Sequence, residues 1–364
     1  MPFEKTRTTF SRRCALRTGS AGAAAALGAA LLAPQALAQS ATPAVDQEQT
    51  MDGLSAAILE AYKGLPGRQG LMFLAPPDAG RPAWSMALNA DDHFFIASVF
   101  KALALAECLR QEEALLDPAS SVPLAAQLSL RLAQQLPLDE SVFSLVAPVL
   151  NSPALTGMVT LRTALEAMIA HSDNTATDIV LKHVGPENVE AFIAEIGLTQ
   201  TEIPLSTRQF FGYVFGVTDW ENTTWDHLVN PDPSLPPRPI LNETITMAST
   251  PREMVSFYTR ALQGAFFQYS VTLEVFRQIL ALGDAVLRSM PLGVNGFGKG
   301  GSIDFDGSHV LTFAGGLYVP DRWVSFALFL NWTDDDGGDT GAVQGAYLTA
   351  AQTIFALIRD RLSQ

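Results

Sequence analysis

Strand-like segments at both ends of the chain, with helical segments between them, most constrain how this sequence can fold. Residues 70–76 and 82–89 have strand-like composition and are joined by a Pro/Asp/Gly turn. Residues 308–319 and 323–332 predict two more strands near the C-terminus. There is no regular alternation of strands with helices. The order therefore predicts one antiparallel sheet assembled from both termini.

Helical periodicity dominates the middle of the chain. We expect helices over residues 53–63, 98–116, 160–171, 175–184, 250–262 and 341–362. Aromatic residues, Pro and Asn interrupt this pattern over residues 199–249. Because unstructured segments of that length are usually functional or disordered, we expect one long ordered loop region there. The predicted fold class is α+β, with flanking helices on the sheet and an inserted all-α lobe.

The domain boundaries follow from this order. We expect one domain over residues 39–364. Its α/β lobe would comprise about 50–97 and 251–364, and its helical lobe about 98–250. A cleft between the two lobes is the expected position of the functional site.

Residues 1–38 predict an export signal of the twin-arginine type. They contain the pair Arg12 and Arg13, an apolar run over 19–33, and Ala36-Leu37-Ala38 as a cleavage site. A membrane anchor is the alternative, but the apolar run is short and weakly hydrophobic for a span. We therefore expect a periplasmic or secreted protein with no stable membrane span after cleavage.

Charge and cysteine content exclude several classes of function. The chain has 37 Asp and Glu against 23 Lys and Arg, a net charge of −14, so we expect no nucleic-acid partner. Cys14 lies in the signal, so Cys108 has no intramolecular disulfide partner and is expected in the core. The five His residues lack metal-site spacing, and the acidic segment 333–341 lacks the EF-hand pattern. We expect a monomer without metal or cofactor.

Ser98 and Lys101 stand three residues apart at the start of a predicted apolar helix. A serine hydroxyl needs a base to become a nucleophile, and lysine can be that base only if its pKa is lowered. Burial, a helix N-terminus and a second cation would all lower the pKa. Arginine could not replace this lysine, because it does not give up its proton. Alone, the pair also fits a helix-capping serine and a lysine that points to solvent.

Two more short motifs follow in the chain. Ser172, Asp173 and Asn174 lie between two predicted helices, and Lys299 precedes two glycines at the head of a predicted strand. By themselves these are ordinary turn residues and a hairpin bend.

In this order, however, S-x-x-K, S-D-N and K-G-G resemble the motif set of class A β-lactamases and penicillin-binding proteins. The segments "FFIASVFKALAL", "TLRTALEAMIAHSDNTATDIVLKHVG", "TMASTPREMVSFYTRAL" and "AGGLYVPDRWVSFALFLNW" extend the likeness over most of the chain. The resemblance implies a β-lactamase-like fold, with the sheet built from both termini.

The resemblance also implies roles for the residues that move protons. Ser98 would be the acylated nucleophile, and Lys101 would be its base or part of a relay through water. Ser172 would pass a proton to the leaving nitrogen. Lys299 would keep the local field positive and Lys101 deprotonated.

Three other positions would bind the substrate. Asn174 would orient the substrate amide and Lys101. The backbone N–H groups of Ser98 and Ser302 would form an oxyanion hole. Gly301 would leave the strand room to approach the substrate closely.

The sequence departs from the family pattern where deacylation is expected. The glutamate of an E-x-x-L-N motif, which activates the deacylating water, is missing, and its position falls near Thr207 or Arg208. Neither side chain is a general base at neutral pH. Glu202 and Glu221 are candidates for a replacement base, although both also fit ordinary surface carboxylates.

A second departure concerns the charge of the substrate. Gly300 replaces the threonine of K-T-G, and His309 stands where the family often has an arginine. Because both family groups bind the substrate carboxylate, their loss favours a neutral ester or amide.

The sequence thus predicts an exported active-site serine hydrolase of the class A β-lactamase type. It would form an acyl-enzyme on Ser98 and hydrolyse a β-lactam or a related amide or ester, with a small-molecule or peptide-like acyl substrate. The alternatives are a slow penicillin-binding or DD-peptidase-like protein, a neutral ester or amide hydrolase, and a catalytically inactive binding protein on the same fold.

Overall fold

A computed structural model describes residues 53–78, 80–319 and 321–362 of the chain. The expected export signal and its cleavage site lie outside the described residues.

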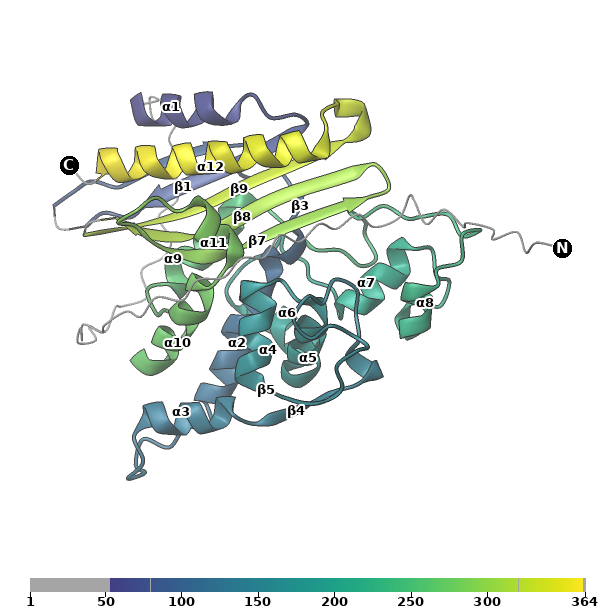
Figure 1. Cartoon of the computed structure of the whole chain (residues 1–364). Coiled ribbons are helices and arrows are strands. Elements are labelled where there is room, and N and C mark those ends of the chain that lie inside the picture. The colour runs from purple at the N-terminus through teal and green to yellow at the C-terminus, as the bar shows by residue number, and fades with distance from the viewer. Residues whose placement is uncertain (1–52, 79, 320, 363–364) are drawn as a thin grey trace.

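Five antiparallel strands form the sheet, in the order β2-β1-β9-β8-β7 (Figure 1). The strands are β1 (Arg68–Ala75), β2 (Trp84–Leu88), β7 (Asn295–Phe305), β8 (Ser308–Val319) and β9 (Arg322–Thr333). The prediction of one antiparallel sheet built from both ends of the chain is therefore confirmed. Among the described residues β7 pairs only with β8, so it forms one edge of the sheet.

The position of Lys299 within β7 corrects the simpler interpretation of its motif. The strand begins four residues earlier, at Asn295, and continues to Phe305, so Lys299 lies inside the strand and not at a hairpin bend. The register pairs Lys299 with Ala314 of β8. Four glycines around Lys299 make this segment hard to recognise as a strand, because glycine has a low strand propensity.

Helices α1 (Gly53–Tyr62) and α12 (Thr340–Leu362) cover one face of the sheet (Figure 1). Helix α12 is long and apolar enough to cross a membrane, the one such helix in the described residues. Its side chains Tyr347, Ile354, Phe355 and Ile358 are buried and belong to the same core cluster as Phe326 of the sheet. Packing on the sheet therefore accounts for its apolar character.

A group of helices lies on the other face of the sheet, around the buried helix α2 (Lys101–Glu113) (Figure 1). Every residue of α2 from Lys101 to Leu109 is buried, which explains the run of apolar residues there. The surrounding helices are α4 (Leu161–Ala170), α5 (Asn174–Val184), α6 (Pro186–Glu195), α9 (Pro251–Ala261) and α10 (Ser270–Ala281). Helix α3 (Leu124–Leu132) and the pair β4 (Gln135–Leu138) and β5 (Gly157–Thr160) complete this part of the fold.

The expectation of one long loop over residues 199–249 was wrong in part. This region contains α7 (Thr207–Val214) and α8 (Trp225–Val229), and it ends in β6 (Ala248–Ser249), which pairs with β3 (Phe94–Phe95). Ser206 caps α7 by accepting a hydrogen bond from the backbone N–H of Gln209. Ser206 before the aromatic segment of α7 is therefore a sequence signal for a helix start. The many Pro and Asn residues of the region favoured a loop prediction instead.

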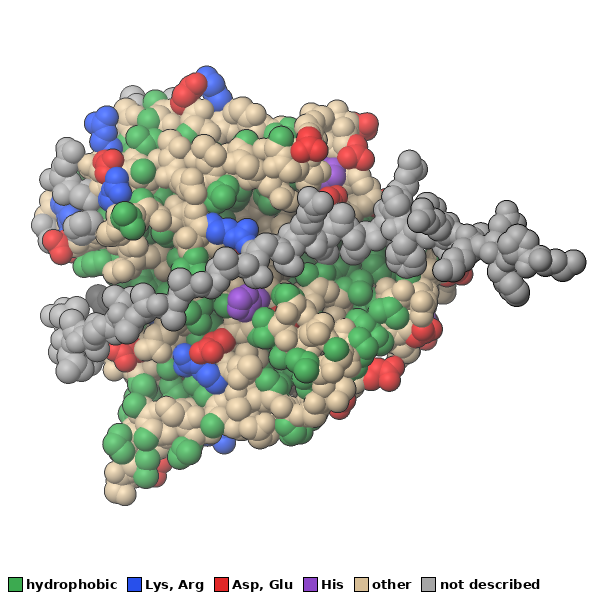
Figure 2. Space-filling view, viewed as in Figure 1, with side chains coloured by type: hydrophobic (Ala, Val, Ile, Leu, Met, Phe, Trp, Pro, Cys, Tyr) green, Lys and Arg blue, Asp and Glu red, His purple; other side chains and the backbone are tan. Residues whose placement is uncertain are grey.

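Charged side chains of both signs are scattered over the visible face of the molecule (Figure 2). Acidic and basic groups alternate with apolar and neutral areas, and no broad basic patch is visible on this face.

Candidate active site

Ser98 lies in a short 3-10 helix, η1 (Ala97–Phe100), and Lys101 is the first residue of α2. We expected a helix starting near Ser98, and the chain instead makes one tighter turn before the α-helix begins. A 3-10 helix has three residues per turn, so residues i and i+3 lie directly above one another. The side chains of Ser98 and Lys101 therefore lie on the same face of this turn. Lys101 is completely buried, at 0% exposure.

The S-D-N motif forms the turn between α4 and α5. Asp173 is the N-cap of α5, and its Oδ1 accepts a hydrogen bond from Ala176 N (2.8 Å). Its other oxygen accepts from the backbone N–H groups of Val149 and Leu150 (2.9 and 2.8 Å). Ser172 has a positive φ of 56°, which is uncommon for a residue other than glycine. Asp173 thus holds Ser172 in a strained conformation at the start of the helix.

A hydrogen-bond network joins these two motifs. Lys101 Nζ donates to Asn174 Oδ1 (2.7 Å), to the Ser172 backbone oxygen (2.8 Å) and to Ser172 Oγ (3.2 Å). Ser172 Oγ in turn donates to Ser98 Oγ (2.7 Å). Hydroxyl protons rotate, so the same contacts can carry a proton from Ser98 through Ser172 to a neutral Lys101. The hydrogen-bonded connection between Lys101 and Ser98 therefore runs through the Ser172 hydroxyl, whereas the resemblance implied a direct contact or a water.

The electrostatic environment favours a neutral Lys101. Burial lowers the pKa of Lys101 well below its ordinary value, and the positive charge of Lys299 lowers it further. Three carboxylates oppose these effects: Asp173, Asp178 and Asp284. Burial also lowers the pKa of Lys299, to about 8. At neutral pH Lys299 is therefore mostly charged, and it acts as the second cation that the sequence called for.

Strand β7 passes close to the first turn of η1. A Cβ atom on Gly301 would lie 2.5 Å from the backbone oxygen of Ile96 and 2.8 Å from Ser98 N. Thr312 Oγ1 fixes this approach by donating to Ile96 O (2.8 Å). The glycine is thus required for β7 to lie beside the backbone N–H of Ser98, with Ser302 as the next residue along the strand.

Packing also explains the second glycine of the motif. A Cβ atom on Gly300 would lie 2.8 Å from Ala285 Cβ in α11 (Asp284–Ser289). The threonine of the family motif would therefore not fit against this helix without a shift.

His309 contacts carboxylates and not the site. Its Nε2 lies 2.8 Å from Asp334 Oδ1, its Nδ1 lies 3.0 Å from Asp304 Oδ1, and its ring stacks on Trp332. Strand alternation places it on the opposite face of β8 from Thr312, the residue that reaches η1. His309 is only 6% exposed, so it is not available to bind a substrate carboxylate.

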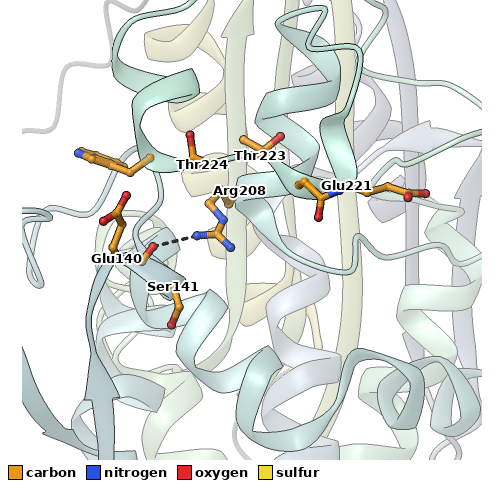
Figure 3. Close-up of a pocket in the computed structure, with 8 residues that line it drawn as sticks. Glu140, Ser141, Arg208, Glu221, Thr223 and Thr224 are labelled. Atoms are coloured by element: carbon orange, nitrogen blue, oxygen red, sulfur yellow. Dashed lines mark hydrogen bonds between the residues drawn. The ribbon is translucent and has the colours of Figure 1, made fainter.

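The segment where we expected a glutamate begins α7 and is attached to α5 by Asp178. The Asp178 carboxylate accepts hydrogen bonds from the backbone N–H groups of Thr207 (2.7 Å) and Arg208 (3.0 Å). The Arg208 side chain points into a pocket of about 380 Å³, where Nη1 donates to Glu140 O (2.8 Å) (Figure 3). Glu221 lines the same pocket.

The other candidate base, Glu202, lies elsewhere. It pairs with Ala248 through its backbone, its carboxylate is 3.5 Å from His93 Nε2, and it lines a second pocket of about 640 Å³. Neither of the two pockets is lined by Ser98, Lys101 or Ser172. Within residues 53–362 as described, no group of three or more His, Cys, Asp or Glu side chains could hold a metal ion.

Sequence reasoning missed several residues near the site, above all Asp178, Asp284 and Thr312. A signal existed for Asp178, because it is four residues after Asn174 on a helix and therefore lies on the same face. Asp284 and Thr312 come from distant segments, and no local pattern indicates them.

Comparison with known proteins identifies the family. A model of the beta-lactamase enzyme family matches residues 54–309, more than half of the chain. The chain belongs to this beta-lactamase enzyme family. A beta-lactamase of Amycolatopsis lactamdurans is 37% identical over 114 residues, which are 31% of this chain and 32% of that relative. The match therefore spans about a third of the relative's length.

Solved structures agree on the fold. A beta-lactamase from Chitinophaga pinensis covers 85% of this chain and 100% of its own, with a TM-score of 0.61 at 18% identity. A class A beta-lactamase from Mycobacterium abscessus covers 83% and 98%, with a TM-score of 0.59 at 17% identity. The predicted β-lactamase-like α+β fold is therefore confirmed, and its structural neighbours are class A beta-lactamases.

Proposed function

We propose that this member of the beta-lactamase family is an exported serine hydrolase that forms an acyl-enzyme on Ser98. The observation that carries the proposal is the unbroken hydrogen-bond chain from Ser98 Oγ through Ser172 Oγ to the buried Lys101 Nζ. Ser98 Oγ attacks the substrate carbonyl, its proton passes to Ser172, and the Ser172 proton passes to Lys101. The leaving group then takes a proton from Ser172 Oγ, and Ser172 regains one from Lys101.

The strand edge supplies the remaining parts of this mechanism. The backbone N–H groups of Ser98 and Ser302 stabilise the oxyanion, and the close approach of Gly301 supports this role. The charged Lys299 keeps Lys101 neutral between turnovers. Asn174 holds Lys101 through its Oδ1 and is itself fixed by donating to Leu145 O (2.9 Å).

Covalent labelling tests the proposal directly. We expect a fluorescent acylating probe to add one acyl group to the purified protein, as measured by intact mass, and peptide mapping to place it on Ser98. Ser98→Ala should remove the label, because it deletes the hydroxyl that contacts Ser172 Oγ.

The lifetime of the label distinguishes the alternatives. A transient label supports a hydrolase, and a label that persists for hours favours a penicillin-binding or DD-peptidase-like protein. Absence of any label on Ser98 would contradict the proposal and favour a binding protein on the same fold.

We further propose that the substrate is a neutral ester or amide. The support is that Gly300 has no side chain to offer a carboxylate, while His309 lies between Asp304 and Asp334. We expect the second-order rate of Ser98 acylation by a neutral phenyl ester to exceed that by benzylpenicillin by about tenfold or more, since one lost charge-assisted hydrogen bond changes binding by about 1.5–3 kcal/mol. Equal rates, measured by stopped-flow fluorescence, would count against a neutral substrate.

A further inference from the structure

Asp178 and Thr207 form a buried carboxylate–hydroxyl pair where the family's glutamate is missing. Thr207 Oγ1 donates to Asp178 Oδ1 (2.8 Å), and it also lies 2.8 Å from Ser144 Oγ. Asp178 is 4% exposed and Thr207 is 1% exposed. The two backbone N–H groups that Asp178 accepts hold its carboxylate in place. When the single hydroxyl proton of Thr207 points to Asp178, the Thr207 oxygen is free to accept a proton from another group.

The pair is connected to the lysine network through one residue. Thr207 Oγ1 lies 3.3 Å from the backbone oxygen of Asn174, whose side chain accepts a hydrogen bond from Lys101 Nζ. In the part of the chain that the structure describes, no carboxylate forms a hydrogen bond with Ser98, Lys101 or Ser172. Asp178 is linked to Lys101 by three contacts, through Thr207 and Asn174, and its charge raises the pKa of Lys101.

We propose that Thr207 and Asp178 together accept the proton of the water that hydrolyses the acyl-enzyme; this rests on the proposed acylation of Ser98. The water oxygen attacks the acyl carbon, and one of its protons passes to Thr207 Oγ1 while the Thr207 proton passes to Asp178. The C–O bond to Ser98 then breaks, and the second water proton goes to Ser98 Oγ. The product leaves as a carboxylate, and Asp178 releases its proton to solvent.

The surroundings of Asp178 suit this role. Burial raises the pKa of Asp178 to about 6, against the effect of its hydrogen bonds to Thr207 and Arg208. The carboxylate is therefore mostly ionised at pH 7 and is a stronger base than an ordinary aspartate. The titratable groups that interact with it are Arg208 on α7, whose charge lowers the pKa of Asp178, and Lys101 on α2.

Comparison of Thr207→Val with Thr207→Ser tests the contribution of the Thr207 hydroxyl to deacylation. Valine has nearly the same shape as threonine and leaves both backbone hydrogen bonds to Asp178 in place. After acylation by a phenyl ester, we expect Thr207→Val to deacylate about 100-fold more slowly than the wild type, within the usual range for proton transfer by a side chain. Its acylation rate should stay within about threefold of wild type. Thr207→Ser keeps the hydroxyl and should deacylate nearly normally.

Thr201→Val is the matched control. Thr201 Oγ1 donates to Glu253 Oε2 (2.6 Å), so this variant removes another buried hydroxyl–carboxylate pair outside the network. We expect its deacylation rate to be unchanged. The pH dependence is a second test that needs no variant at Thr207. The wild-type deacylation rate should increase as the pH rises through about 6, and this increase should be absent in Asp178→Asn.

The outcomes separate this inference from the proposed function. If Thr207→Val is acylated on Ser98 and then deacylates at the wild-type rate, the role of Thr207 and Asp178 is overturned, but the proposed acylation of Ser98 is not. Equal slowing in Thr207→Val, Thr207→Ser and Thr201→Val, or a wild-type rate that is flat around pH 6, would also overturn it. Failure of the wild type to acylate would overturn the proposed function together with this inference.

Discussion

Replacing Lys101 by Arg is expected to lower the rate of Ser98 acylation by about a thousandfold or more. The guanidinium group does not give up its proton, so Ser172 would have no acceptor for the proton that it takes from Ser98. General-base catalysis typically contributes about 10²–10⁴ in rate, and the acceptor of this chain has no substitute among its described partners. Time-resolved intact mass with an acylating probe measures the rate.

Two variants make the Lys101 experiment interpretable. Lys101→Met keeps a side chain of similar length without a base and should lose acylation to the same extent. Lys182→Arg changes an exposed lysine that donates to Ser141 Oγ, and its rate should match the wild type. In the wild type, acylation should fall as the pH drops through the lowered pKa of Lys101, because the protonated amine cannot accept. Normal acylation of Lys101→Met would remove the lysine from the mechanism.

Replacing Gly301 by Ala is expected to lower the acylation rate by about 100-fold or more. The added Cβ would stand 2.5 Å from Ile96 O and 2.8 Å from Ser98 N, and both are backbone atoms that cannot rotate away. Strand β7 would move from η1, and the backbone N–H groups of Ser98 and Ser302 that we propose as the oxyanion hole would separate. Removal of one such donor costs about 10²–10³ in rate in other acyl-transfer enzymes.

Gly345→Ala in α12 is the matched control for this substitution. Gly345 is exposed in the second turn of the helix, and outside the backbone of that helix no atom lies within 4 Å of a Cβ built there. We expect its acylation rate to be unchanged and its free energy of unfolding to increase by about 0.5–1 kcal/mol, since alanine favours helix over glycine. Thermal denaturation of both variants separates a loss of fold from a loss of the oxyanion site. Wild-type acylation by a folded Gly301→Ala protein would contradict the proposed position of the oxyanion hole.

Most of the secondary structure could be predicted from local patterns. The helix of Lys101, the two helices around Ser172 and the strands after Lys299 all have runs of apolar residues that match their burial. The prediction failed where other signals competed with periodicity. Glycine obscured the first half of β7, and Pro and Asn concealed α7.

The sequence indicated which residues are candidates for the site, but not which of them contact one another. The motifs indicated Ser98, Lys101, Ser172, Asn174 and Lys299. They did not indicate that Ser172 lies between the lysine and the nucleophile. That arrangement depends on the positive φ of Ser172 and on the hydrogen bonds of Asp173 to the segment at Val149 and Leu150. Such contacts join segments more than twenty residues apart, and no short sequence pattern contains them.

The sequence by itself determined the order of the elements, the family resemblance and the candidate reactive side chains, because these follow from local periodicity and from the chemistry of single residues. Only the tertiary structure decided that Lys101 is completely buried, that His309 is held between two carboxylates, and that Thr207 lies against Asp178. The physical reason is that burial and hydrogen-bond distance depend on how distant segments pack together. The same packing sets the pKa of each buried group.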